Sequence, residues 1–284
     1  MAIKIGMLCD FFKPGEKPKA VDIFECLELA KDLKVDTVDM DFKRGFTSTD
    51  PAYLMSVKRQ AIRYGLPIGY VCSALIMGGT DEEAAPRVAQ AKKDVDMAVF
   101  MGASMTHVYA YGGHQPDGTP EYEKGWAAIA RRCREIADYA NERGISVGVQ
   151  NHNSGSWLAD EKTVVRLMND VGRDNFFLHL DTGQWKDSIT TQPRGVVKNQ
   201  ADPMVHETYI AKTLKYARHT RAKMYNLASG TEKYIDYRNV ARILRAQNFN
   251  GVMTIVLDNE TIDTISDIDM VRRAVPYLRG CFRQ

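Results

Sequence analysis

The sequence predicts an α/β protein in which eight β/α units close into one (β/α)8 barrel that spans residues 1–284 as a single domain. Short strand-like runs alternate with longer helical patterns eight times along the chain. The length of 284 residues is close to the roughly 250 residues of such a barrel. The first strand-like run also lacks the GxGxxG turn of an open dinucleotide-binding sheet, the competing architecture.

Each element is predicted from the spacing and type of its apolar residues. Runs rich in β-branched and aromatic residues, as in a parallel sheet covered by helices, predict the strands. These runs cover residues 3–9, 37–42, 67–75, 105–111, 146–152, 176–181, 222–227 and 252–258. Apolar residues spaced three and four apart predict the helices between them. These patterns cover residues 21–33, 53–64, 81–101, 123–143, 160–171, 205–219, 237–247 and 268–278.

Two longer segments, residues 112–122 and 182–204, follow the fourth and sixth predicted strands. Loops in these positions lie over the mouth of a barrel, so each segment is predicted to be a lid or an oligomer contact. Trp185, Pro193 and the Val196-Val197 pair in the second segment are consistent with a contact between subunits. We expect a homo-oligomer, and a hetero-oligomer remains an alternative.

Composition excludes several classes of partner. The chain has 38 basic and 36 acidic residues, a net charge of +2, which provides no field for nucleic acid or for a membrane surface. It has no apolar run of membrane-spanning length and no signal segment at its start, which predicts a cytoplasmic protein. The five cysteines are far apart and odd in number, so we interpret them as reduced thiols.

Polar residues gather where predicted strands end, which is where a barrel enzyme builds its active site. The fifth strand ends in Gln150-Asn-His152, and alternate residues of a strand point to the same side. Gln150 and His152 are therefore expected to contact one ligand. In the alternative interpretation, both residues only hydrogen-bond within the barrel.

The sixth strand brings an apolar run up to Asp181, which is followed at once by Thr-Gly-Gln184-Trp185. Asp181 is the strongest candidate for a site residue, although an aspartate here can also cap a turn. In the seventh strand Arg221, Lys223 and Tyr225 alternate. A lysine that points into a barrel needs an anionic partner, for which we predict Asp181. A purely structural ion pair is the alternative.

The remaining candidates are less specific. Asp258 lies at the end of the eighth strand, whereas Glu260 is expected to be a cap at the start of the last helix or a solvated charge. His107 aligns with Tyr109 and Tyr111 as one wall, a pattern more typical of packing than of sugar stacking. We predict catalytic roles for Asp181, Lys223 and His152, and substrate-binding roles for Gln150, Arg221, His107, Gln184, Trp185 and Asp258.

Several motifs in order make the chain resemble the sugar phosphate isomerase/epimerase family with the xylose isomerase-like TIM barrel. They are Val35-Asp-Thr-Val-Asp39, Gly148-Val-Gln-Asn-His152, Leu180-Asp-Thr-Gly183, Ala222-Lys223, Lys233-Tyr-Ile-Asp236-Tyr and Ile243-Leu-Arg-Ala-Gln-Asn-Phe-Asn-Gly251. The resemblance extends over nearly the whole chain. It implies a barrel enzyme that epimerises or isomerises a sugar.

The resemblance also implies one divalent metal, held by a glutamate, an aspartate, a histidine and a glutamate on strands five to eight. At the matching positions this chain has Gln150, Asp181, Arg221 and Val256. Hard divalent ions are held largely by anionic oxygen, so we predict no tightly bound metal. Weak binding of Mn or Mg remains open, with Gln150, Asp181 and Asp258 as the candidate ligands.

The sequence therefore leads to one preferred function and two alternatives. The preferred function is a sugar isomerase or epimerase acting on a small polyol or keto-sugar through an enediolate, with Arg221 and Lys223 stabilising the charge. The first alternative is a lyase or dehydratase that forms the same enolate. The second is a non-catalytic partner subunit of a sugar-processing hetero-oligomer.

Overall fold

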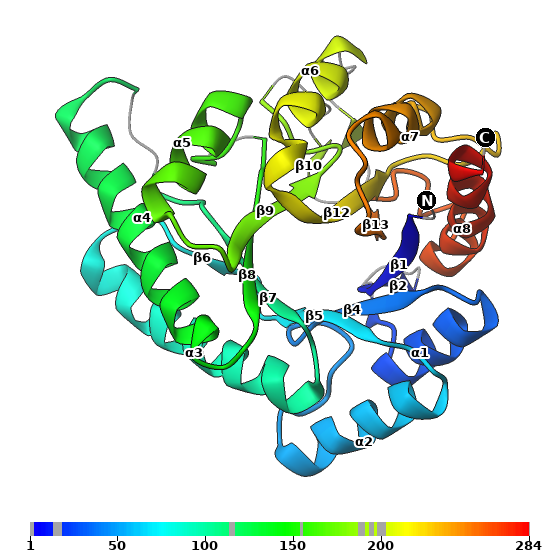
Figure 1. Ribbon diagram of the computed structural model, residues 1–284. Coiled ribbons are helices and arrows are strands. Elements are labelled where there is room, and N and C mark those ends of the chain that lie inside the picture. Colours follow the sequence, from blue (N-terminus) through cyan, green and yellow to red (C-terminus); the bar gives the residue numbers. More distant parts are fainter. Residues whose placement is uncertain are drawn as a thin grey trace.

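The computed structural model describes residues 3–13, 19–113, 117–153, 156–186, 191–192, 196–197 and 203–283. Within these ranges, eight parallel strands form a closed ring, and helices connect consecutive strands on its outside (Figure 1). The predicted (β/α)8 barrel is thus confirmed.

The strands of the ring follow one another in chain order. They are β1 (Lys4–Cys9), β4 (Thr37–Asp41), β5 (Ile68–Cys72), β7 (Met105–Tyr109), β8 (Ser146–Gln150), β9 (Phe176–Asp181), β12 (Ala217–Met224) and β13 (Val252–Leu257). The ring closes where β1 pairs with β13, with Lys4 opposite Val252. Five short strands are additional to the ring: β6 (Leu75–Ile76), which pairs with β7, the pair β2 (Phe12–Lys13) and β3 (Lys19–Ala20), and the pair β10 (Thr191–Gln192) and β11 (Val196–Val197).

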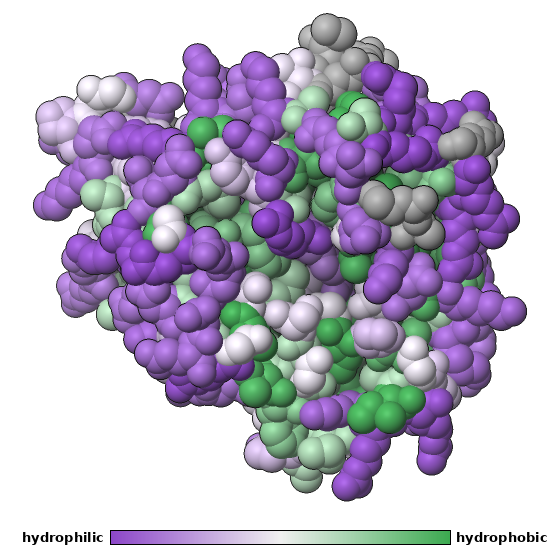
Figure 2. All heavy atoms as spheres, in the orientation of Figure 1, coloured by the Kyte–Doolittle hydropathy of each residue, from purple (hydrophilic) through white to green (hydrophobic). Residues whose placement is uncertain are grey.

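The helices bury one apolar side against the ring and begin at residues suited to that position. They are α1 (Ile23–Asp32), α2 (Pro51–Arg63), α3 (Asp81–Met101), α4 (Pro120–Asn141), α5 (Glu161–Val171), α6 (Pro203–Thr213), α7 (Tyr237–Ala246) and α8 (Asp267–Phe282). In α3, for example, the Thr80 side chain and Glu83 form a capping box, and Gly102 ends the helix with a φ of 81°. Charged and polar side chains cover the helical rim, with less polar ones nearer the centre (Figure 2).

The largest difference from the predicted elements lies at residues 205–227. Helix α6 ends at Thr213, a 3-10 turn η1 (Leu214–Tyr216) follows, and β12 begins at Ala217 rather than at residue 222. Pairing in the sheet overrides the helical pattern, since His219 lies opposite Val252 of β13. The strand ends at Met224 because the Glu232 carboxylate accepts the next two backbone N–H groups, those of Tyr225 and Asn226.

The centre of the barrel contains a polar cluster beside a small apolar one that includes Leu8, Met105 and Val256. The Nε2 atom of His219 lies 2.8 Å from Asp39 Oδ2 and 2.8 Å from Thr254 Oγ1. Tyr70 packs edge-on against His219, with 5.8 Å between ring centroids. Because each of these polar groups is satisfied, they form a fixed layer on which the mouth of the barrel is built.

Other sequence predictions have mixed outcomes. The five cysteines are free thiols, all of them buried, as expected. Within the described ranges, none of the helices has the length and apolarity needed to cross a membrane. Parts of the two long segments, Pro193 among them, lie outside the described residues, so their role as lid or contact stays a prediction.

Candidate functional site at the mouth of the barrel

A cavity of about 190 Å³ opens where the barrel strands end. Its lining comes from strands around the ring and contains cationic, acidic, imidazole and phenol groups. Those polar residues are Asp10, Asp41, Arg44, Tyr70, His107, Tyr109, Gln150, His152, Gln184, Arg221, Lys223 and Asp258. The volume is below the roughly 300–1,000 Å³ of pockets that take drug-sized ligands, which indicates a small ligand.

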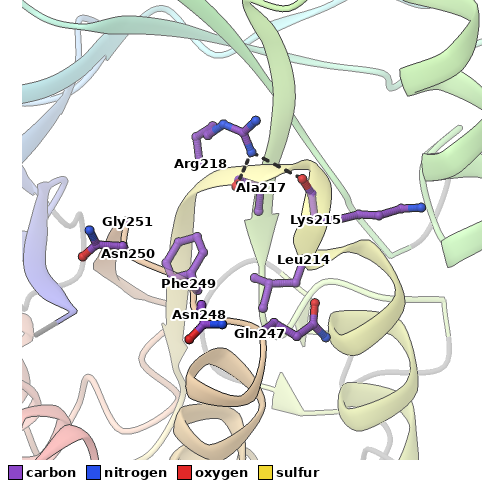
Figure 3. Close-up of a pocket in the computed structure, with 9 residues that line it drawn as sticks. All are labelled: Leu214, Lys215, Ala217, Arg218, Gln247, Asn248, Phe249, Asn250 and Gly251. Atoms are coloured by element: carbon purple, nitrogen blue, oxygen red, sulfur yellow. Dashed lines mark hydrogen bonds between the residues drawn. The ribbon is translucent and has the colours of Figure 1, made fainter. Parts of the chain in front are cut away.

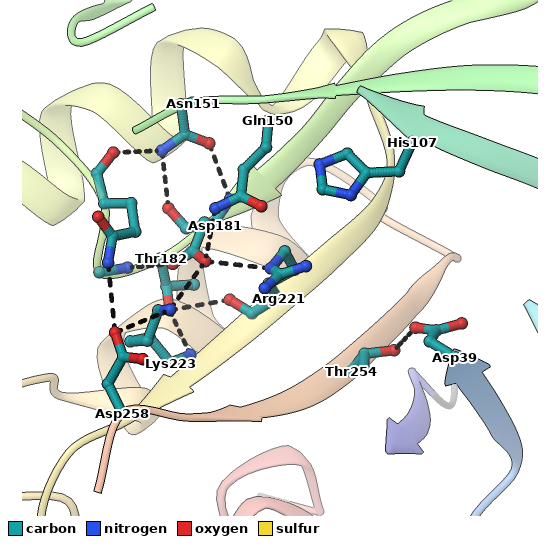
Figure 4. Close-up of polar contacts among 12 residues, drawn as sticks. Asp39, His107, Gln150, Asn151, Asp181, Thr182, Arg221, Lys223, Thr254 and Asp258 are labelled. Atoms are coloured by element: carbon teal, nitrogen blue, oxygen red, sulfur yellow. Dashed lines mark hydrogen bonds and ion pairs between the residues drawn. The ribbon is translucent and has the colours of Figure 1, made fainter. Parts of the chain in front are cut away.

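Asp181 is the central anion beside this cavity, and its side chain is completely buried. Its Oδ2 atom lies 3.1 Å from Arg221 Nε and 3.5 Å from Lys223 Nζ (Figure 4). Gln150 Nε2 donates to the same oxygen at 3.2 Å. The predicted pairing of Asp181 with Lys223 is confirmed, and Arg221 joins it.

The chain around Asp181 is fixed by its neighbours. Asn151 Oδ1 accepts the backbone N–H of Asp181 at 2.8 Å, and Asn151 Nδ2 donates to the carbonyls of Asp181 and Gln184. The N–H of Gly183 donates to Asp181 Oδ1 at 3.0 Å. A Cβ at Gly183 would come within 2.8 Å of Lys223 Cγ, so the turn can approach the lysine only because this residue is glycine.

Lys223 and Arg221 each join Asp181 to a second group. Lys223 Nζ also lies 3.1 Å from Asp258 Oδ2, whose side chain is 31% exposed at the cavity. Arg221 Nη1 donates to the Tyr70 hydroxyl at 2.9 Å. Burial alone would lower the pKa of Arg221, but the charge interactions with Tyr70, Tyr109 and Asp181 raise it above its usual value. Two buried cations therefore face the cavity in fixed positions.

The histidines of the site are neutral. Burial, followed by the positive charge of Lys223, lowers the pKa of His152 to about 4. Burial and then the charge of Arg221 lower the pKa of His107 well below its usual value. An unprotonated imidazole can accept a proton, so His152 is a base that is available at neutral pH.

The opposite wall of the cavity was missed in the sequence analysis. Arg44 forms an ion pair with Asp10, and Asp41 lies beside them in the lining. Burial raises the pKa of Asp41, against the effects of the Lys43 backbone N–H and of the Arg44 charge. The alternation of Asp39 and Asp41 in the second strand was the available signal, because both must point into the barrel.

Seven of the nine predicted site residues line the cavity: His107, Gln150, His152, Gln184, Arg221, Lys223 and Asp258. Asp181 is not in the lining, but its Oδ2 atom contacts Arg221 and Lys223, which are. Trp185 does not belong to the lining. It is buried in the core and packs against Tyr209, with 5.3 Å between ring centroids. The expected role of Glu260 as a cap or a solvated charge is wrong, since Ser266 caps α8 and the Glu260 side chain is 13% exposed and accepts the Tyr234 hydroxyl.

A second hollow of about 350 Å³ lies at the opposite, amino-terminal end of the strands (Figure 3). Its lining includes Lys215, Arg218 and Gln247, which are all exposed to solvent. The Arg218 guanidinium donates to the carbonyls of Lys215 and Ala217. Among the described residues of this lining there is no carboxylate or histidine, and its two charged side chains, Lys215 and Arg218, are both cations.

Comparison with known proteins gives a family. A model of the family described as "Xylose isomerase-like TIM barrel" matches residues 27–281, and the chain belongs to that family. The chain is similar in structure to 3-keto-D-glucoside 4-epimerase, YcjR, from E. coli in its apo form, with 16% identity, coverage of 99% of this chain and 100% of that one, and a TM-score of 0.72.

Two further structures resemble it to the same degree. One is D-psicose 3-epimerase from Clostridium cellulolyticum H10 with D-tagatose, at 11% identity, with coverage of 99% and 97% and a TM-score of 0.72. The other is D-allulose 3-epimerase from Methylomonas sp. with D-allulose, at 15% identity, with coverage of 98% and 96% and a TM-score of 0.71. At these identities the likeness shows the fold alone. Among curated protein sequences, none matches this chain.

The metal that the family resemblance implies does not fit the residues present. Gln150 turns an N–H donor toward Asp181, and the cations of Arg221 and Lys223 already contact the one carboxylate at the matching positions. A divalent ion there would lose anionic ligands and face two positive charges. Among the described residues, no group of three or more His, Cys, Asp or Glu side chains could hold a metal ion.

Proposed function

We propose that this chain is an enzyme of the sugar isomerase or epimerase type, which moves a proton between carbons of a small keto-sugar or polyol through an enediolate. The observation that carries the proposal is the pair of buried cations, Arg221 and Lys223, fixed by Asp181 at the wall of the cavity. Family membership and the sugar epimerases among similar structures support the same class of reaction.

The two cations can stabilise the negative charge that develops on the substrate oxygen, which is the main energetic cost of the reaction. When the proton next to a carbonyl leaves, its electron pair forms a carbon–carbon double bond and the carbonyl oxygen becomes an oxyanion. Donors that are already in place stabilise such a charge without reorganisation. We assign this role to Arg221 and Lys223, and to Asp181 the task of orienting them.

His152 is the base in this proposal. It lines the cavity, its imidazole is neutral, and its Nδ1 atom is buried without a hydrogen-bond partner among the described residues. The imidazole takes the proton from carbon and returns it to the neighbouring carbon for isomerisation, whereas epimerisation requires that a second group deliver a proton to the opposite face. Asp258, which holds Lys223 and is partly exposed, is placed to bind a substrate hydroxyl.

Hydrogen exchange in deuterated water tests the proposal. We expect D-tagatose, D-fructose or D-allulose to gain deuterium next to the carbonyl, as measured by NMR. His152→Gln and Lys223→Met should lower the rate by about 10²–10⁴-fold, the usual contribution of such groups. Lys215→Met, at the other end of the barrel, is the matched control and should leave the rate unchanged.

The outcomes separate the alternatives. Exchange accompanied by loss of water or of a substituent would identify a lyase. Exchange only after addition of a second protein would indicate a partner subunit. No exchange with the isolated chain, or exchange insensitive to both variants, would contradict the proposal.

A further inference from the structure

The floor of the cavity contains polar atoms that the protein itself does not satisfy. Gln150 Oε1 and His107 Nε2 are buried and have no hydrogen-bond partner among the described residues, and both residues line the cavity. Buried polar atoms in native proteins are nearly always paired, with protein, water or ligand. Two such atoms at the floor of one cavity therefore point to a polar ligand group.

The orientation of Gln150 follows from its neighbour. A carboxylate can only accept hydrogen bonds, so the contact with Asp181 Oδ2 must be made by the amide nitrogen. The amide oxygen then faces away from Asp181, and Figure 4 shows it on the side toward His107. Gln150 thus offers an acceptor to the cavity and keeps its donor for the charged network.

His107 is held as firmly as Gln150. Its Nδ1 atom lies 3.7 Å from the thiol sulfur of Cys72, and its ring packs against Tyr109 with 4.5 Å between centroids. The strand register places His107 opposite Gly148 and Tyr109 opposite Gln150. His107 therefore lies one inward-facing position below Gln150 on the neighbouring strand. The absence of a side chain at Gly148 makes room for Met105 and His179, which pack against it.

We propose that Gln150 Oε1 and His107 Nε2 form a subsite for one hydroxyl group of the substrate. A hydroxyl donates one hydrogen bond and accepts others, so it can pair with an amide oxygen and an imidazole nitrogen together. A phosphate dianion or a carboxylate only accepts, and its oxygen would face the amide oxygen without a proton between them. The subsite therefore selects a neutral, hydroxyl-bearing part of the ligand at the floor of the cavity. That this ligand is a sugar rests on the proposed function.

Binding of monodeoxy sugars tests the subsite without reference to turnover. The probes are D-tagatose, D-fructose and D-allulose, together with their monodeoxy derivatives at each hydroxyl-bearing carbon, and binding is measured by calorimetry or by ligand-observed NMR. We expect removal of one particular hydroxyl to weaken binding by about 10- to 100-fold, because without it the buried polar atoms of the subsite are left unpaired. Removal of the other hydroxyls should have smaller effects.

Two variants locate the effect at the floor. His107→Phe keeps an aromatic ring of similar shape, and Gln150→Met removes the amide oxygen. In each, the ratio of affinities for the parent and the deoxy sugar should fall toward one, even where overall affinity also changes. Gln247→Met, which removes an amide at the amino-terminal end, should retain the wild-type ratio.

The possible results bear on the subsite and on the proposed function separately. Binding without discrimination at any single hydroxyl, discrimination that survives both variants, or no binding of any sugar in the panel would overturn the subsite. Deuterium exchange decides the function by itself. A chain that discriminates as expected but catalyses no exchange would retain the subsite and lose the proposed reaction.

Discussion

The two ends of the barrel each carry a hollow, and they differ in a way that volume does not show. The hollow at the amino-terminal end is the larger, about 350 Å³ against about 190 Å³. Its charged side chains are exposed to water, whereas the smaller cavity buries Arg221, Lys223 and Asp181. Burying charges costs stability. The carboxyl-terminal mouth of the barrel, where the chain keeps buried charges despite this loss of stability, is therefore the better candidate for function.

The largest expected effect is that of removing the central anion. Asp181→Asn keeps the shape of the side chain but leaves Arg221 and Lys223 buried beside a neutral amide. Breaking a buried ion pair by removing one partner costs about 3–5 kcal/mol, so we expect a decrease of this size in the free energy of unfolding measured with urea. Asp96→Asn is the control, because the exposed Asp96–Arg143 pair should contribute at most about 1 kcal/mol. Equal losses in the two variants would remove the contrast between buried and exposed charge.

The second effect is a loss of stability in mild acid. Burial lowers the pKa of His107 and His179 well below the usual value, and burial with the charge of Lys223 lowers that of His152 to about 4. The unfolded chain binds protons on these residues as pH falls below about 6.5, whereas the folded chain does not. Stability is therefore fully present above pH 6.5 and decreases as pH falls, with the His152 contribution exhausted near pH 4.

The expected size of this effect is about 1 kcal/mol for each histidine over the first pH unit below 6.5, hence about 3 kcal/mol together. Urea unfolding at pH 7.5, 6.5 and 5.5 would measure this loss. These values lie above, at and below the pKa of a free imidazole, which is about 6.5. His107→Phe should remove about a third of the pH-dependent loss. A free energy of unfolding that stays constant across this range would show that the histidines take up protons in the folded chain over the same pH range as in the unfolded chain.

Sequence reasoning found most of the site because period-two alternation is reliable at strand ends. Four of the predicted residues follow buried apolar runs, and each lies at or beside the mouth of the barrel, as the position of its strand predicted. They are Gln150, Asp181, Lys223 and Asp258. It failed for Trp185, since no local pattern tells whether an aromatic residue after a turn packs into the core or faces a cavity. It missed Asp10 and Arg44 because their ion pair joins two loops that meet only in the folded chain.

The helix predicted over residues 205–219 shows a different limit. The segment has helical spacing up to Tyr216, and nothing in its local sequence marks Ala217 as the start of a strand. The position of His219 is decided by Asp39 and Thr254, which come from two other strands. A residue fixed by distant partners cannot be placed by its neighbours in sequence.

A small effect is expected at the other hollow. The Arg218 side chain is exposed and donates only to nearby backbone carbonyls. Arg218→Ala should therefore change the free energy of unfolding by no more than about 0.5 kcal/mol, with deuterium exchange unaffected. A large loss of exchange would show that the amino-terminal end takes part in function and would overturn the comparison.

The smallest expected effect is that of divalent metal on the wild-type chain. The melting temperature should be the same with added Mn2+ and with a chelator, because Arg221 and Lys223 hold the positions around Asp181. A stoichiometric ion in protein purified without chelator would contradict this. The informative control is the triple variant Gln150→Glu, Arg221→His and Val256→Glu, which places the metal-binding residue types that the family resemblance implies at the matching positions. This variant should gain about 2.7 kcal/mol at a metal concentration one hundred times its dissociation constant. Such a gain would show that the barrel can still present metal ligands, so that the side chains at these positions, rather than the backbone, exclude the ion.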